Sequence, residues 1–128
     1  MSTHPAATPA ATPLPDADYL ARTRVVLDGI EARVDHWLDA DLIDIDSFRS
    51  GGLLELSFPG GSKIVINTQA PLQELWLAAR AGGFHFRFCG GAWLDTKIGV
   101  EFHAMLSTQA SAQGGQVLSF TPPSSVAE

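Results

Sequence analysis

Apolar residues at two different spacings divide the chain into a helix, a run of strands and a second helix. After Asp16, apolar positions recur every three or four residues, as on one face of an α-helix. That apolar stripe consists of Leu20, Thr23, Leu27, Ile30, Val34 and Trp37. Asp16 and Asp18 would complement the helix dipole in the first turn, so we expect the helix to begin near Asp16.

Beyond this helix, apolar and polar residues alternate, which is the period of half-buried β-strands. The alternating runs cover residues 54–58, 63–69, 74–79 and 84–88, and a short strand is expected around Trp93. Proline and glycine supply turns at 59–62, 82–83 and 90–91. Short strands joined by tight turns predict an antiparallel meander of five or six strands.

A second helical pattern follows the strands. Asp95 or Thr96 is a suitable N-cap, the apolar stripe contains Phe102, Met105 and Leu106, and glycines 114–115 end it. Residues 117–120 are expected to lie back on the domain. The order helix, meander, helix predicts an α+β two-layer sandwich, with both helices on one face of the sheet and water on the other.

These elements define one domain over residues 16–120. Residues 1–15, rich in Ala, Thr and Pro, are expected to form a disordered arm, and residues 121–128 a flexible tail. No apolar run has the length of a membrane span, and the N-terminus lacks the features of a signal peptide. The single Cys89 excludes a disulfide framework, so we expect a cytoplasmic protein.

The strand alternation also predicts which residues occupy the open face of the sheet. If Ile64, Ile66 and their neighbours form the core, then Asn67, Gln69 and Trp76 share the opposite face. A large indole facing water on a polar sheet is typical of an anchor for a partner protein. A loop covering this face is the alternative.

The negative charge of the chain is concentrated in one segment. The formal net charge is −6, and residues 16–46 alone hold nine acids and three arginines, whereas the rest of the chain is balanced. Such a field repels nucleic acid and anionic membranes, and it attracts metal cations or a basic protein surface. We therefore expect neither nucleic-acid nor membrane binding.

Four acids in this segment, at positions 28, 31, 35 and 39, have the spacing of one helix face. Two more, at positions 44 and 46, alternate with Ile43 and Ile45 on a predicted strand, and one lies between the two groups. The candidate cation ligands are therefore Asp28, Glu31, Asp35, Asp39, Asp41, Asp44 and Asp46. His36 borders this stripe and is either a nitrogen ligand or a bystander. The stripe itself is either a solvated helix face or a cation site.

No catalytic motif accompanies these acids. The sequence has no nucleophile elbow, phosphate-binding glycine loop or HExxH zinc motif. A catalytic carboxylate pair needs a cleft that separates the two pKa values, whereas these acids are expected on a convex surface. The sequence therefore favours a binding protein over an enzyme.

The segment from residue 51 to 102 closely resembles the signature region of the frataxin family in its bacterial form. The matching elements, in order, are GSKIVIN (61–67), Gln69, Pro71, LWLA (75–78), GGFHF (82–86), Trp93, Gly99 and Glu101-Phe102. With the acidic first helix, the resemblance covers roughly residues 16–120.

The resemblance implies an α–β–α sandwich that binds ferrous or ferric iron weakly through the acidic stripe. It also implies contacts with a cysteine desulfurase and with the scaffold of iron–sulfur cluster assembly. By position, Glu31 and Asp35 would serve both iron and partner, and Asn67, Gln69 and Trp76 would contact the partner assembly. The expected protein is a monomer, with iron-dependent oligomers as a further possibility.

Three functional hypotheses remain open on these grounds. The first is an iron-binding regulator or iron donor for cluster assembly. The second is a pure protein-interaction regulator of the desulfurase, for which iron binding is incidental. The third is a ferroxidase or iron-storage protein. A buried cluster of metal ligands would favour this hypothesis, but no pattern in the sequence indicates such a cluster.

Overall fold

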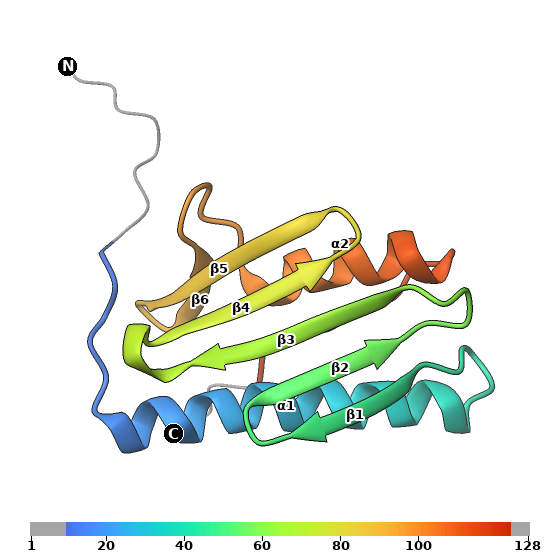
Figure 1. Cartoon of the computed structure of the whole chain (residues 1–128), viewed down its shortest axis with the longest axis horizontal. Helices are drawn as coiled ribbons and strands as arrows, with labels where there is room; N and C mark the ends of the chain where they lie inside the picture. Colours follow the sequence, from blue (N-terminus) through green and yellow to red (C-terminus); the bar gives the residue numbers. More distant parts are fainter. Residues whose placement is uncertain (1–9, 124–128) are drawn as a thin grey trace.

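In the computed structural model, which describes residues 10–123, two helices lie on one face of an antiparallel sheet (Figure 1). The elements in chain order are α1 (Asp16–Asp39), β1 (Asp46–Ser50), β2 (Leu53–Ser57), β3 (Lys63–Gln69), a 3-10 turn η1 (Ala70–Leu72), β4 (Glu74–Ala79), β5 (Gly82–Cys89), β6 (Ala92–Asp95) and α2 (Phe102–Gly114). The six strands follow one another across the sheet in chain order, β1 to β6. The predicted α+β sandwich and antiparallel meander are therefore confirmed.

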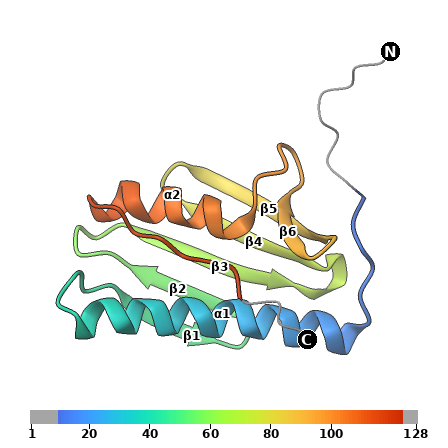
Figure 2. The same ribbon diagram turned by 180° about the vertical axis from the view of Figure 1, so that it is seen from behind.

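Both helices cover the same face of the sheet, as the view from behind shows (Figure 2). The alternation of β3 and β4 produces this layer, since Ile64, Ile66, Leu75 and Leu77 are all buried beneath the helices. The opposite face carries no helix, and Asn67 and Trp76 are only partly buried there. The predicted division into a core face and an open face is thus correct.

The buried face of α1 differs from its prediction at the first turns. Leu20 is 53% exposed, whereas Tyr19 and Val26 are buried. Tyr19 can lie in the core because its hydroxyl donates to the Glu74 carbonyl oxygen at 2.7 Å, which leaves no unpaired polar atom. From Thr23 to Trp37 the predicted stripe is buried as expected.

The strand predicted around residues 43–46 begins later than expected. Ile45 is buried and Asp44 is exposed, so the alternation is right, but β1 starts only at Asp46. The reason lies in the partner strand: Asp46 pairs with Ser57, the last residue of β2. Beyond Ser57 the chain enters the turn closed by the Phe58 N–H and the Ser62 carbonyl, so residues 43–45 have no strand opposite them.

The N-cap of α2 was predicted at Asp95 or Thr96 and is instead Glu101. Asp95 holds a separate turn, in which its Oδ1 accepts from the backbone N–H groups of Lys97 and Ile98 at 2.7 and 2.8 Å. The chain then crosses to α2, where the Glu101 carboxylate accepts from the N–H groups of His103 and Ala104. Both acids satisfy free backbone donors, but only Glu101 does so at a helix start.

The segment after α2 lies back on the domain as predicted. Leu118 and Phe120 are buried, and the Phe120 ring packs edge-on against Trp37 of α1 at 5.0 Å. The described part of the predicted N-terminal arm also contacts the domain. Thr12 N–H donates to the Phe88 carbonyl, and the backbone N–H and carbonyl of Leu14 both form hydrogen bonds with the Gln73 side chain. Residues 1–9 and 124–128 lie outside the described residues, and the domain limits stay predictions.

Candidate functional site

Seven acids extend from α1 through the following loop to the start of β1, and we call them the acidic ridge. They are Asp28, Glu31, Asp35, Asp39, Asp41, Asp44 and Asp46. Six are exposed and Glu31 is half-buried, so the ridge faces water rather than a cleft. Asp39 ends the helix, and Asp41 follows in the left-handed conformation with φ of 58°. His36, predicted as a bystander or a ligand, is exposed beside it.

The ridge does not form a closed metal shell. Among residues 10–123, no group of three His, Cys, Asp or Glu side chains is arranged to hold a metal ion. Carboxylate oxygens suit hard cations, but a cation here would keep much of its water because the protein does not surround it. The donor set fits a hydrated cation at an open surface and does not fit an enclosed cofactor.

The end of α1 adds its own negative field to part of the ridge. Asp35 and Asp39 lie in the last turns of the helix, where the macrodipole is negative and unpaired carbonyl groups face outward. Acids at this end are unfavourable for the helix unless a cation compensates for them. Among the described residues, Asp35, Asp39, Asp41, Asp44 and Asp46 make no ion pair with a basic side chain, and we call these five the distal ridge.

The other two ridge acids are paired with Arg49, a residue that the sequence analysis did not single out. Arg49 Nη1 donates to Asp28 Oδ1 at 3.0 Å and to Glu31 Oε1. Partial burial lowers the pKa of the Arg49 guanidinium, but hydrogen bonds and charges of Asp28 and Glu31 raise it more, so the net pKa lies above its ordinary value. No local pattern signals this contact, because it depends on how β1 pairs with β2.

The open sheet face brings together the residues that alternation had placed there. Asn67 of β3 pairs with Trp76 of β4, which in turn pairs with His85 of β5. The indole of Trp76 stacks flat on the His85 ring, with 4.2 Å between ring centroids and 4° between planes. Gln69 is two pairs further along, opposite Glu74, and so lies on the same face. The predicted partner residues thus share one surface, and Trp76 is held in a fixed orientation.

Glu74 lies on the same face of β4 as Trp76 and fixes this surface through its carboxylate. Its side chain is 9% exposed. Glu74 Oε1 accepts from Trp76 Nε1 at 2.8 Å, and Oε2 accepts from Arg87 Nε at 3.2 Å. A buried carboxylate needs such donors, and here both donors are side chains of the open sheet face. His85 Nδ1 lies 3.6 Å from the same carboxylate.

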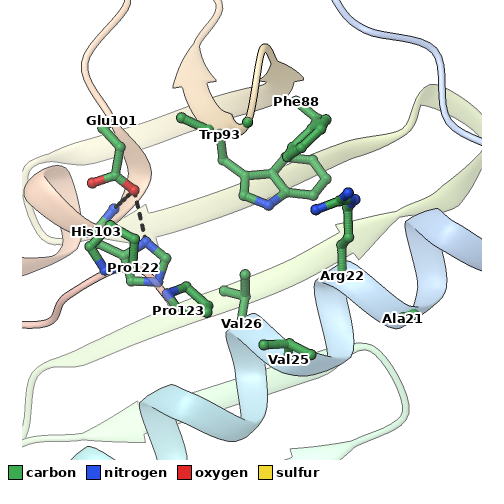
Figure 3. A pocket seen from close by; sticks show the side chains of 12 residues that line it. Ala21, Arg22, Val25, Val26, Phe88, Trp93, Glu101, His103, Pro122 and Pro123 are labelled. Atoms are coloured by element: carbon green, nitrogen blue, oxygen red, sulfur yellow. Dashed lines mark hydrogen bonds and ion pairs between the residues drawn. The ribbon is translucent and has the colours of Figure 1, made fainter. Parts of the chain in front are cut away.

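A hollow of about 300 Å³ lies elsewhere, between α1, the β5–β6 turn and the start of α2 (Figure 3). Arg22 extends over the Phe88 ring at 4.6 Å on one side, and the Glu101–His103 pair lies on the other. Burial raises the pKa of Glu101, but hydrogen bonds from the His103 ring and from two backbone N–H groups lower it more, so the net pKa is below its ordinary value. None of the ridge residues lines this hollow.

The other chemically notable residues lie outside the ridge. Trp37, Trp93 and Cys89 are buried, while His85 lies on the sheet surface. His103 lies on α2 and is buried, with Nδ1 2.8 Å from Glu101. Within residues 10–123, no helix is both long and apolar enough to cross a membrane.

Comparison with known proteins agrees with this fold. The chain matches the family model described as a frataxin-like domain over residues 12–116. It is 53% identical over 108 residues to the iron–sulfur cluster assembly protein CyaY of Cupriavidus taiwanensis, covering 84% of this chain and 97% of that protein.

Solved structures agree with the sequence matches. A frataxin from Psychromonas ingrahamii has a TM-score of 0.75 at 30% identity, covering 84% of this chain and 99% of that one. Trimeric frataxin from Saccharomyces cerevisiae, solved in complex with ferrous iron, has a TM-score of 0.54 at 25% identity, covering 84% of this chain and 93% of that one. The fold is thus the two-layer frataxin fold. The chain belongs to the frataxin family, in its bacterial CyaY form.

Proposed function

We propose that this protein binds iron at the acidic ridge and acts in iron–sulfur cluster assembly as a non-catalytic regulator or iron donor. Its partners would be a cysteine desulfurase and the scaffold on which clusters form. Family membership supports the assembly role, because the matched CyaY proteins carry that description. The ferrous complex of a yeast relative supports iron as the metal.

The observation that carries the proposal is the unpaired distal ridge at the negative end of α1. Five carboxylates face water there without a basic partner among the described residues. Such a surface attracts a metal cation and also a basic patch on another protein, and long-range attraction speeds that encounter at low salt. The same residues would therefore serve iron and the desulfurase.

The affinity for iron should be modest and poorly selective. Ferrous iron stands low in the order of divalent affinities, and exposed carboxylates do not impose a coordination geometry. His36 would be the one soft contribution if it binds, since imidazole suits iron better than calcium. Weak, partly hydrated sites fit a protein that receives iron and gives it up again.

The open sheet face would provide the second contact, to the partner assembly. Trp76 is fixed by its stack on His85 and its bond to Glu74, so little freedom would be lost on binding. Asn67 and Gln69 place amide groups beside it that are able to hydrogen-bond across an interface. An aromatic residue surrounded by polar groups is the usual composition of a binding hot spot.

A pure interaction protein, for which iron is incidental, is the second candidate. The absence of a closed metal shell within residues 10–123 favours it. The discriminating measurement is the activity of the purified desulfurase with and without this protein while iron is chelated. A response that survives chelation supports the interaction protein, whereas a response that requires iron supports the iron-dependent role.

The docking half of the proposal is tested by charge reversal. The double change Asp35→Lys with Asp39→Lys should weaken desulfurase pull-down at low salt by roughly tenfold or more, because like charges would face each other. It should weaken iron binding at the same time. The matched control reverses Asp16 and Asp18, which lie on the same helix in its first turn, and should leave both largely intact. Unchanged pull-down by the Asp35/Asp39 variant would contradict desulfurase docking.

A further inference from the structure

The first two acids of the ridge, Asp28 and Glu31, form ion pairs with the side chain of Arg49. The Arg49 guanidinium lies between Asp28 and Glu31 and donates to both from one nitrogen atom. The side chains of Arg49 and Glu31 are 23% and 30% exposed, so water reaches this pair only in part. Reduced hydration strengthens the attraction between the opposite charges compared with a fully exposed pair.

The backbone of β1 keeps Arg49 in this place. Arg49 pairs with Leu54 of β2, whose side chain is fully buried on the helix-covered face, so Arg49 leaves the strand on the same side. Because β1 is the edge strand next to α1, this direction leads to the helix rather than into the core (Figure 1). A further bond from Arg49 Nε to the Gly51 carbonyl at 3.3 Å holds the side chain across the hairpin.

We propose that Arg49 is a built-in counter-ion that keeps metal cations away from Asp28 and Glu31. The exclusion of metal from Asp28 and Glu31 concerns any divalent cation. Its consequence for iron, that iron would bind only at the distal ridge, rests on the proposed function. A metal at Glu31 would either lie beside the guanidinium charge or have to displace it. Arginine does not lose its proton in the physiological range, so this block is permanent.

The two parts of the ridge therefore differ in a way that the acidic pattern alone does not reveal. Asp28 and Glu31 share one guanidinium, which offsets one of their two negative charges, and they lie more than one turn before the negative end of α1. The distal acids have no such partner among the described residues, and Asp35 and Asp39 are nearest the helix end. Removal of Arg49 should thus add a cation site, not merely strengthen an existing one.

Manganese(II) is a suitable probe, because it is a hard divalent cation that is stable in air. In the wild-type background, Glu31→Gln should leave the Mn²⁺ affinity unchanged. Arg49→Gln alone should raise the Mn²⁺ affinity roughly fivefold over that of wild type. Adding Glu31→Gln to Arg49→Gln should remove that gain. This cycle isolates Glu31 from the general change in charge.

Arg33→Gln is the matched control for charge. Arg33 lies on the same helix, two residues from Glu31, but its Nε bonds to the Ser119 carbonyl and its guanidinium lies over Trp37 rather than beside an acid. The Arg33→Gln substitution removes the same charge without exposing Glu31, so Glu31→Gln should not change the Mn²⁺ affinity in that background. Arg49→Lys keeps the charge but loses the planar fork, so it should give a smaller gain than Arg49→Gln.

The outcomes separate this inference from the proposed function. A Glu31→Gln change that weakens Mn²⁺ binding equally with and without Arg49 would overturn the exclusion and leave ridge binding intact. Wild-type protein that binds neither Mn²⁺ nor Fe²⁺, with binding gained on Arg49→Gln, would support the exclusion and contradict iron binding. If Arg49→Gln fails to fold, the same cycle in an Arg49→Met background decides the question, because methionine also removes the charge while filling the space of the aliphatic stem.

Discussion

At the scale of single residues, Glu74 illustrates how a buried charge organises a surface. It lies on the open face of the sheet, shielded by its neighbours, and its two carboxylate oxygens accept from the Trp76 indole and the Arg87 guanidinium. Leaving the buried Glu74 carboxylate without these donors would cost free energy, which favours keeping both hydrogen bonds. The orientation of the Trp76 indole thus depends on its hydrogen bond to Glu74 as well as on its stack on His85.

The change Glu74→Gln tests this arrangement. The amide still accepts from Trp76 but presents N–H groups toward Arg87, so the free energy of unfolding should fall by about 1–3 kcal/mol. The indole N–H resonance of Trp76 should shift in the proton–nitrogen NMR spectrum. Glu55→Gln is the matched control, because Glu55 pairs with Lys63 at 3.0 Å in an exposed ion pair. It should cost less than about 1 kcal/mol and leave the Trp76 resonance in place. Equal effects of the two changes would contradict a special role for Glu74.

Single residues also show where prediction from sequence reaches its limit. Asn67, Gln69 and Trp76 were placed correctly on one face, because strand alternation has a fixed period of two residues. Arg49 was missed, because its contact with Glu31 joins residues 18 apart and depends on strand pairing. The ridge could be predicted as a list of acids, but not which of those acids are already paired.

At the scale of elements, boundaries were predictable where a local signal marks them. β3 spans residues 63–69 as expected, because a glycine turn precedes it and Pro71 follows it. The short strand β1, with sequence DSFRS, has no apolar alternation of its own and is defined by its pairing with β2. The N-cap of α2 was misplaced, because two acids six residues apart both satisfy backbone N–H groups, one in a turn and one at the helix.

The N-cap of α2 gives a pH-dependent prediction. The pKa of Glu101 is lower in the folded protein than its unfolded value of about 4.3, so its contribution to stability is present at neutral pH. That contribution is lost as the pH falls through the lowered pKa, when the carboxylate takes up a proton.

Glu101→Gln should therefore reduce the free energy of unfolding by about 1 kcal/mol at pH 7, since a charged cap is replaced by a neutral one. The difference from wild type should shrink as the pH falls below about 4. Urea denaturation of both proteins at pH 7 and pH 3 measures it. A difference that is the same at both pH values would show that the carboxylate charge of Glu101 does not contribute.

At the scale of the whole molecule, the charge distribution and the fold act together. The entire net charge of −6 arises from residues 16–46, which form α1, the following loop and the first residue of β1. The sheet turns its open face in a different direction from the helices (Figures 1 and 2). One partner surface could therefore attract the ridge at long range while another contacts the sheet. Salt should weaken the first contact more than the second.

Iron binding at the distal ridge can be tested by an anaerobic titration with ferrous iron, followed residue by residue by NMR. Calcium in a parallel titration is the control for generic negative charge. We expect line broadening centred on residues 35–46, little involvement of Asp28 and Glu31, and weaker changes with calcium. An equal response to both cations, no response at all, or broadening centred away from the ridge would contradict it.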